Sequence, residues 1–312
     1  MKILVVGATG VLGHATARRL LAQGVAVRAM TRSPERAADL AAQGAEVVAG
    51  DLTDRASLAR ACDGIDRVLA AAHSMLGRGR YRSEQVDDAG HRALIDTARA
   101  SGVQCFVYTA VRGVGAAHPV DFFRTKHAIE QHLLGSGLPH VVLRPSAFME
   151  HHVHTFNGKA LLEKGQARLI GAGTKQRNFV GAADVAQFAV LALTADPMPG
   201  PVIEIGGPGN FSNNEVAELY ARLAGIAPRI SHLPGSLARL LSHVAAPIHP
   251  GVARLMRLLG LPDDAFDETF DSAALQRAYP ALRLTPLETF VRARIAHASR
   301  RPASRGRVDG PW

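Results

Sequence analysis

The chain has 312 residues, a formal net charge of +9 and 47% apolar residues, the balance of a globular protein with a sizeable core. It contains no long uncharged apolar run, and MKILVVGATG lacks the apolar region of a secretory signal, so we expect neither a membrane span nor export. The two cysteines, Cys62 and Cys105, argue against a disulfide framework and favour a reduced, cytoplasmic setting. Six arginines lie between Arg292 and Arg307 with no nucleic-acid-binding motif beside them, so we expect no nucleic-acid partner.

The first half of the chain alternates strand and helix patterns with short connections. Short apolar runs predict strands buried on both faces, and 3.6-residue periodicity predicts the helices between them. Ser33 is expected to cap the second helix, with Pro34 at its first position. The strands are expected over 3–6, 25–30, 45–49, 68–72, 105–109 and 140–143, and the helices over 11–22, 34–43, 83–100 and 121–134. This βαβ order predicts an α/β fold with a Rossmann-type, doubly wound parallel sheet.

After residue 146 the pattern changes and becomes mainly helical. A helix over 184–194 and a strand over 202–205 are expected to return to the first domain. The leucines of 239–261, punctuated by arginines, predict two helices packed over a substrate cleft, with a membrane-surface helix as the alternative. We therefore predict a Rossmann domain over 1–145, rejoined by about 178–206, a smaller substrate-side domain from 146–177 and 207–298, and a basic disordered tail over 299–312.

A glycine-rich loop, GATGVLG, directly follows the first strand and opens the first helix. In this context the spacing is typical of a dinucleotide-binding turn, because the glycines permit a tight turn, close approach of a diphosphate and close packing of helix on strand. The exposed N–H groups and the positive end of the helix dipole favour the phosphates. The cofactor-binding residues predicted here are Gly7, Thr9, Gly10, Val11, Leu12 and Gly13.

The end of the second strand indicates which dinucleotide is bound. NAD-binding proteins usually place an acidic residue there to hold the ribose 2′-hydroxyl. This chain has no acidic residue before Glu35, and Arg32 and Ser33 are suited to a 2′-phosphate. We therefore favour NADP(H) over NAD(H), although a solvated turn arginine and a helix cap would explain the same two residues.

Together with later motifs, these residues resemble the short-chain dehydrogenase/reductase superfamily, in particular its atypical, NmrA-like and NAD(P)H-binding branch. The resemblance implies that Asp51 and Leu52 line the adenine pocket and that Ala71 and Ala72 border the ribose; a turn or cap role for Asp51 is the alternative. The motifs that carry the resemblance are GATGVLG at 7–13, Arg32, GDL at 50–52, VYTAV at 107–111, Lys126 with Glu130, LRP at 143–145, FME at 148–150, FV at 179–180 with DVA at 184–186, and IGG at 205–207.

The resemblance also identifies a departure at the catalytic position. Active members of the superfamily generally carry a Tyr four residues before a Lys, so that both side chains share one helix face. Here Lys126 occupies the lysine position, but Phe122 stands where the Tyr is expected, and a phenyl ring cannot transfer a proton. Thr109 approximately matches the serine that orients the substrate.

Two functions remain open. The first is an NAD(P)H-dependent oxidoreductase acting on a small carbonyl, enone or quinone compound, with Lys126, Tyr81, His73, Tyr108 or water as the proton donor. The second is a non-catalytic, NmrA-like redox sensor or regulator that binds NADP(H) and acts through a protein partner. A homodimer is left open in both.

An apolar substrate pocket beside the nicotinamide is expected if the protein is a reductase. Ordinary core packing is the alternative for each of its apolar members. The histidine cluster at 151–154 lacks the ligands that complete a zinc motif, so no metal is predicted. The predicted lining residues are Phe122, Ser146, Phe148, Met149 and His152.

Overall fold

The computed structural model describes residues 1–300, which form two compact units. The first unit comprises Met1–Pro145, Ala182–Ile205 and Ser236–Leu261, and the second comprises Ser146–Gly181, Gly206–Gly235 and the chain from Pro262 onward. The segment Ser236–Leu261 therefore belongs to the first unit, although the sequence pattern placed it in the second. Of the predicted tail, Ser299 and Arg300 end a helix, and residues 301–312 lie outside the described residues.

A seven-stranded parallel sheet forms the centre of the first unit, in the order β10-β6-β5-β4-β1-β2-β3. The predicted Rossmann-type, doubly wound α/β fold is confirmed. The switch in strand order falls between β1 and β4, where ligands of such sheets bind. The strands are β1 Lys2–Val6, β2 Ala26–Thr31, β3 Glu46–Ala49, β4 Arg67–Ala70, β5 Cys105–Thr109, β6 His140–Pro145 and β10 Val202–Ile205.

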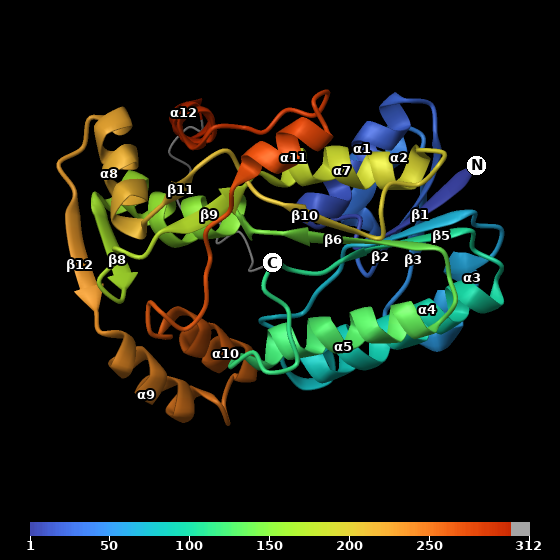
Figure 1. The fold of residues 1–312 in the computed structure, drawn as a ribbon, viewed down its shortest axis with the longest axis horizontal. Coiled ribbons are helices and arrows are strands. Elements are labelled where there is room, and N and C mark those ends of the chain that lie inside the picture. The colour runs from blue at the N-terminus through green and yellow to red at the C-terminus, as the bar shows by residue number, and fades with distance from the viewer. Residues whose placement is uncertain (301–312) are drawn as a thin grey trace. The chain divides into compact units, whose positions relative to one another are not determined.

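Helices cover both faces of this sheet. In Figure 1, α1, α2 and α7 lie on one face, and α3, α4 and α5 lie on the other. The apolar strand residues are consequently buried from both sides, as the continuous apolar runs predicted. The helices of the first unit are α1 Val11–Ala22, α2 Ala38–Ala42, α3 Arg55–Cys62, α4 His91–Ala100, α5 Asp121–Gly135, α7 Ala182–Thr194, α9 Gly235–Ala245 and α10 Pro250–Leu259.

Two predicted helices begin in tighter or wider turns than expected. The helix predicted over 34–43 begins as the 3₁₀ turn η1 (Pro34–Ala37), and the Ser33 side chain makes no capping hydrogen bond. The helix predicted over 83–100 begins as the π-helix η3 (Glu84–Gly90). The His91 ring explains the wider turn, because its Nδ1 lies 3.1 Å and 2.9 Å from the carbonyl oxygens of Val86 and Asp87.

The second unit contains two small sheets, in the orders β11-β9-β7 and β12-β8, packed with short helices. The parallel pair of β12 with β8 was not predicted, because β12 reads RISHL and is largely exposed. No helix of the described chain is long and apolar enough to span a membrane. The elements of this unit are β7 Ala147–Phe148, the π-helix η4 Met149–Gly158, α6 Lys159–Lys164, β8 Gln166–Ile170, β9 Arg177–Val180, β11 Asn210–Phe211, α8 Asn213–Ala224, β12 Arg229–Leu233, α11 Ser272–Ala278 and α12 Leu287–Arg300.

Candidate cofactor and catalytic site

The glycine loop lies at the carboxyl end of β1, at the switch point of the sheet. Gly7 has φ +84°, and a Cβ atom there would come within 2.9 Å of the Ala72 Cα, at the end of β4. A Cβ atom on Gly13 would come within 2.3 Å of the Gly7 carbonyl oxygen. Both positions therefore require glycine, and they bring the backbone of β1, β4 and α1 into close contact.

The first turn of α1 is suited to an anionic group. Gly10 is the N-cap residue and is exposed, and no acidic side chain lies in the first turn. The Leu12 side chain is buried in the core, so only its backbone N–H is available as a ligand group. A helix that begins without a side-chain cap leaves N–H donors for a phosphate, so this turn fits the diphosphate of a dinucleotide.

Arg32 and Tyr81 meet at the end of β2. The Arg32 guanidinium lies 4.4 Å from the centre of the Tyr81 ring, and the Arg80 guanidinium lies 4.6 Å from the same centre. Beside them the Thr31 hydroxyl accepts from the Ser33 N–H at 3.1 Å and lies 3.3 Å from the Thr9 hydroxyl. Tyr81 is a predicted proton donor, but its hydroxyl accepts from Arg80 and its ring lies beside these two arginines.

The residues predicted to surround adenosine occupy the ends of β3 and β4. Asp51 Oδ1 accepts from the backbone N–H and the hydroxyl of Thr53, each at 2.9 Å, so the carboxylate closes a local turn. The Leu52 side chain is buried in the core. Ala71 and Ala72 are half-buried after β4, and the Ala71 N–H donates to the Val6 carbonyl at 3.0 Å.

Lys126 is buried on α5 beside the end of β5. Its side chain is 3% exposed, and Nζ donates to the Thr109 carbonyl at 3.1 Å. Nζ also lies 4.9 Å from the centre of the Tyr108 ring and 5.7 Å from that of Phe122. Burial lowers the pKa of Lys126, and the negative charges of Asp87 and Glu130 oppose part of that shift.

Three buried polar atoms around Lys126 have no hydrogen-bond partner among the described residues: Tyr108 Oη, Thr109 Oγ1 and His91 Nε2. The His91 and Tyr108 rings make an edge-to-face contact with centroids 5.6 Å apart. Burial lowers the pKa of His91 to about 4 and raises that of Tyr108 well above its ordinary value. Orphaned buried polar atoms are uncommon in folded proteins, and three of them lie at this corner, which makes it a candidate functional site.

His91 was not singled out from the sequence. The one available signal was its position four residues after Asp87 within a predicted helix. Asp87 is fully buried and accepts from the Ser74 N–H at 2.8 Å and the Ser83 hydroxyl at 2.5 Å. These contacts hold η3, and with it His91, against β5.

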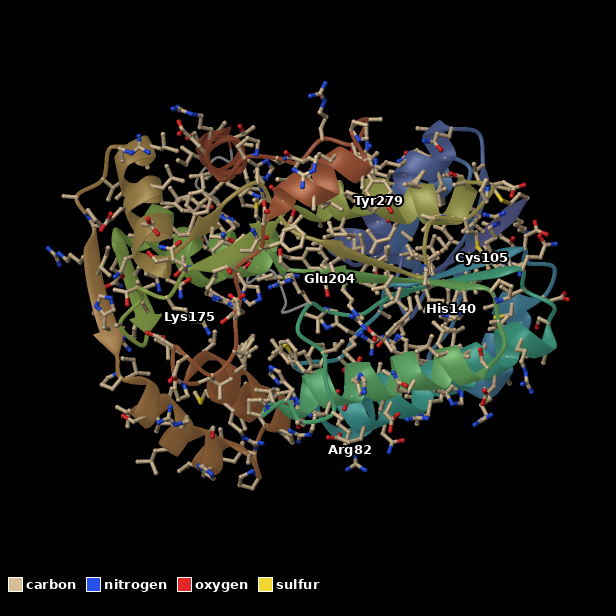
Figure 2. All side chains as sticks on the ribbon, in the orientation of Figure 1. Arg82, Cys105, His140, Lys175, Glu204 and Tyr279 are labelled. Atoms are coloured by element: carbon tan, nitrogen blue, oxygen red, sulfur yellow. The ribbon has the colours of Figure 1, made fainter. Side chains whose placement is uncertain are left out.

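Phe122 is buried in an apolar cluster, and its ring also lies near Lys126 Nζ and contacts the His73 ring edge to face at 6.2 Å. The cluster joins it to Val120 and Phe123 of the first unit, with Met75, Val111, Leu258 and Leu261 packed around them. One helical turn after Lys126, Glu130 is 1% exposed and binds Arg144 through two hydrogen bonds of 3.1 Å and 2.7 Å. Arg144 and Arg112 also lie near Glu204 on β10, which Figure 2 labels. This ion-pair network fixes α5, and therefore Lys126, on β6.

Of the five predicted pocket residues, Phe122 belongs to the first unit and the other four belong to the second. Ser146 donates to Asn178 Oδ1 at 2.7 Å, and Met149 is 1% exposed in the core of its unit, as the packing alternative held. Phe148 is half-buried on β7, and the His152 ring contacts Phe156 edge to face at 5.4 Å. No group of three or more metal-ligating side chains occurs among residues 1–300.

Comparisons with known proteins agree with this architecture. Protein High Chlorophyll Fluorescence Phenotype 244 of Arabidopsis thaliana is 32% identical over 76% of the chain, which spans 59% of that relative's length. The NAD(P)H azoreductase of Xenophilus azovorans is 28% identical over 95% of this chain and 98% of its own. The photosystem II assembly factor Ycf39 of Guillardia theta is 28% identical over 75% of this chain and 74% of its own.

A solved structure is also similar. The NADPH-dependent quinone oxidoreductase of Escherichia coli, complexed with NADPH, has 25% identity and a TM-score of 0.73, covering 96% of this chain and all of the other. The model of the NAD(P)H-binding family matches residues 7–196, which include the glycine loop and Lys126. The chain therefore belongs to the NAD(P)H-binding family. This is a family of NAD(P)-binding oxidoreductases with a Rossmann-type fold.

Proposed function

We propose that the protein is an NADPH-dependent reductase that acts on a small carbonyl, enone or quinone compound. The observation that carries the proposal is the buried Lys126, held by the Thr109 carbonyl at 3.1 Å, at the same edge of the sheet as the glycine loop. Relatives whose names include an azoreductase and a quinone oxidoreductase support the class of substrate.

The chain's own residues would hold the dinucleotide at two places. The backbone N–H groups of the first turn of α1 receive the diphosphate, and Arg32 faces the ribose 2′-phosphate. Lys126 Nζ binds the nicotinamide ribose. When bound, the reduced cofactor supplies a hydride to the electrophilic atom of the substrate.

Protonation of the substrate oxygen then requires a donor other than residue 122. We assign that role to the Lys126 ammonium, which burial has made a stronger acid than an exposed lysine. Its proton goes to the oxygen that becomes negative as the hydride arrives, and water restores it afterwards. The Thr109 carbonyl orients Nζ during this step.

A second function is supported by one specific feature. Phe122 replaces the usual proton donor and is packed among apolar side chains, which suits a protein that binds NADP(H) without turning it over. The relative named as a photosystem II assembly factor is consistent with a role exerted through a protein partner. In that case Lys126 holds the ribose only.

The test separates binding from turnover. The purified protein is titrated with NADPH and NADH by fluorescence, and NADPH absorbance is then followed with a panel of quinones, enones and azo compounds. For a reductase, Lys126→Met is expected to lower kcat by about 100-fold or more. Gln131→Ala, an exposed position on the same helix, is the control. Tight NADPH binding without turnover on any acceptor would contradict the reductase and support the sensor.

A further inference from the structure

We infer that Arg80 and Tyr81 form, together with Arg32, a subsite for the phosphomonoester dianion at the cofactor's ribose 2′ position. The inference rests on the proposed function and deepens it. It assigns two residues of the loop between β4 and η3 to cofactor choice, although the only role that the sequence suggested for either was proton donation by Tyr81.

The strongest observation is the gathering of two cations at one ring. Both guanidiniums lie within 4.6 Å of the centre of the Tyr81 ring, one from the end of β2 and one from residue 80, 48 positions later. Among residues 1–300, no carboxylate lies within ion-pair distance of either guanidinium. Two like charges at one ring repel each other, and a dianion bound between them would remove that repulsion.

Hydrogen bonds hold the loop that presents Arg80 and Tyr81 in a defined conformation. The Ser74 N–H donates to the buried Asp87 carboxylate at 2.8 Å, and the Ser74 hydroxyl donates to the Tyr81 carbonyl. Gly77 is required inside this turn, because a Cβ atom there would overlap the Tyr81 carbonyl oxygen. The Tyr81 N–H closes the 3₁₀ turn η2 (Gly79–Tyr81) by donating to the Arg78 carbonyl at 3.1 Å.

Helix α10 also contacts this loop, through the side chain of Arg254. Arg254 is 4% exposed, and its Nη1 donates to the Met75 carbonyl at 3.0 Å. The same guanidinium binds Asp121 at 2.9 Å and Glu84 at 3.3 Å. The position of Tyr81 beside Arg32 is therefore determined by buried groups before any ligand binds, which lowers the entropic cost of binding.

The hydrogen-bonding capacity of the three side chains matches a phosphate. Each guanidinium presents a planar set of donors that suits two phosphate oxygens. The Tyr81 hydroxyl accepts from Arg80 Nη2, so its own proton remains for donation to a third oxygen. Asp51 is the carboxylate that acts electrostatically on Arg80, and its Oδ1 is already bound by Thr53. A free ribose 2′-hydroxyl offers these donors one uncharged oxygen, whereas a 2′-phosphate offers three anionic oxygens.

The experiment measures the dissociation constants of NADPH and NADH by fluorescence titration, with no turnover required. Arg80→Ala is expected to weaken NADPH binding by roughly 10- to 100-fold, the effect of losing charge-assisted hydrogen bonds, and to change NADH binding by less than about threefold. Tyr81→Phe is expected to weaken NADPH binding by roughly 3- to 10-fold. Arg82→Ala is the matched control, since Arg82, which Figure 2 labels, is exposed on the same loop and lies 3.7 Å from a carboxylate oxygen of Glu84.

Each outcome decides between the two proposals. If Arg80→Ala weakens both dinucleotides equally, or neither, the phosphate subsite is wrong while a dinucleotide-dependent reductase still stands. If the unmodified protein binds NADPH and NADH equally, the subsite is likewise overturned. If it binds neither, the proposed function fails, and the subsite fails with it.

Discussion

The glycine loop and the surroundings of Lys126 lie at the carboxyl ends of two strands of one sheet, yet they are built by different means. The loop uses backbone groups, and its requirement is the absence of side chains at Gly7 and Gly13. The Lys126 corner uses buried polar side chains, three of whose atoms have no described partner. We therefore expect contacts with the diphosphate to depend mainly on backbone geometry, whereas any chemistry would depend on the protonation of buried groups.

The largest effect is expected from a side chain introduced into the glycine loop. Gly13→Val is expected to reduce NADPH affinity more than about 100-fold and to lower the free energy of unfolding by several kcal/mol, because its Cβ would collide with backbone. Titration fluorimetry and urea unfolding measure the two effects. Gly24→Ala, at the other end of α1, is the control: its φ of +74° makes it strained, but its surroundings are open. Gly24→Ala should lower the free energy of unfolding by about 1 kcal/mol and leave NADPH affinity unchanged. Wild-type affinity in Gly13→Val would show that the loop is not the phosphate site.

The Lys126 corner should respond to pH where the loop does not. Burial holds the pKa of His91 near 4 in the folded chain, below its ordinary value of 6.5. The unfolded chain therefore binds more protons between these values, and stability falls as the pH falls from about 6.5 to 4. The loss attributable to His91 is on the order of 2–3 kcal/mol.

His91→Asn isolates this contribution. The asparagine amide can keep the hydrogen bond to the Asp87 carbonyl, but it does not titrate. Urea unfolding at several pH values should show that the free energy of unfolding falls less steeply below pH 6.5, the acid limb of the curve, for His91→Asn than for the unmodified chain. His243→Asn, at an exposed position on α9, should leave the limb unchanged. Equal acid limbs for the two variants would mean that burial of His91 does not govern acid stability.

The sequence predicted the elements that short-range patterns determine. The predicted bounds of α1, β5 and β10 agree with the structure, because a glycine turn, a buried apolar run and flanking prolines define them locally. Helix α3 was not predicted, although Asp54 caps it by accepting from the Ala56 N–H at 3.0 Å. That helix is short and its periodicity is weak, so the cap alone was an insufficient signal.

Contacts between distant positions were beyond sequence reasoning. Arg254 was interpreted as a charge that interrupts an amphipathic stretch, yet it is buried and binds groups from positions 75, 84 and 121. Tyr81 was a candidate proton donor, because nothing local indicates that Arg32 approaches its ring. In both cases the partner is far away in sequence, and the fold brings it within reach of a long side chain.

The smallest expected effect concerns Asp51, which combines features of the two regions. Its Oδ1 closes a backbone turn through Thr53, and Oδ2 is the atom that would accept from the adenine amine. In Asp51→Asn the amide oxygen can keep the hydrogen bonds of the turn. The free energy of unfolding should therefore change by less than about 0.5 kcal/mol. The amide NH₂ then faces another donor, and both NADPH and NADH should bind roughly 3- to 10-fold more weakly.

Asp51→Asn thus distinguishes adenine recognition from phosphate recognition. Because the adenine is common to both dinucleotides, Asp51→Asn should weaken the binding of NADH as well as that of NADPH, whereas Arg80→Ala should weaken mainly that of NADPH. Thr53→Val, which removes a hydroxyl bound to the same oxygen, is the matched control for loss of the turn. Weaker binding in Thr53→Val with normal binding in Asp51→Asn would assign the effect to the turn and exclude a contact between the carboxylate and adenine.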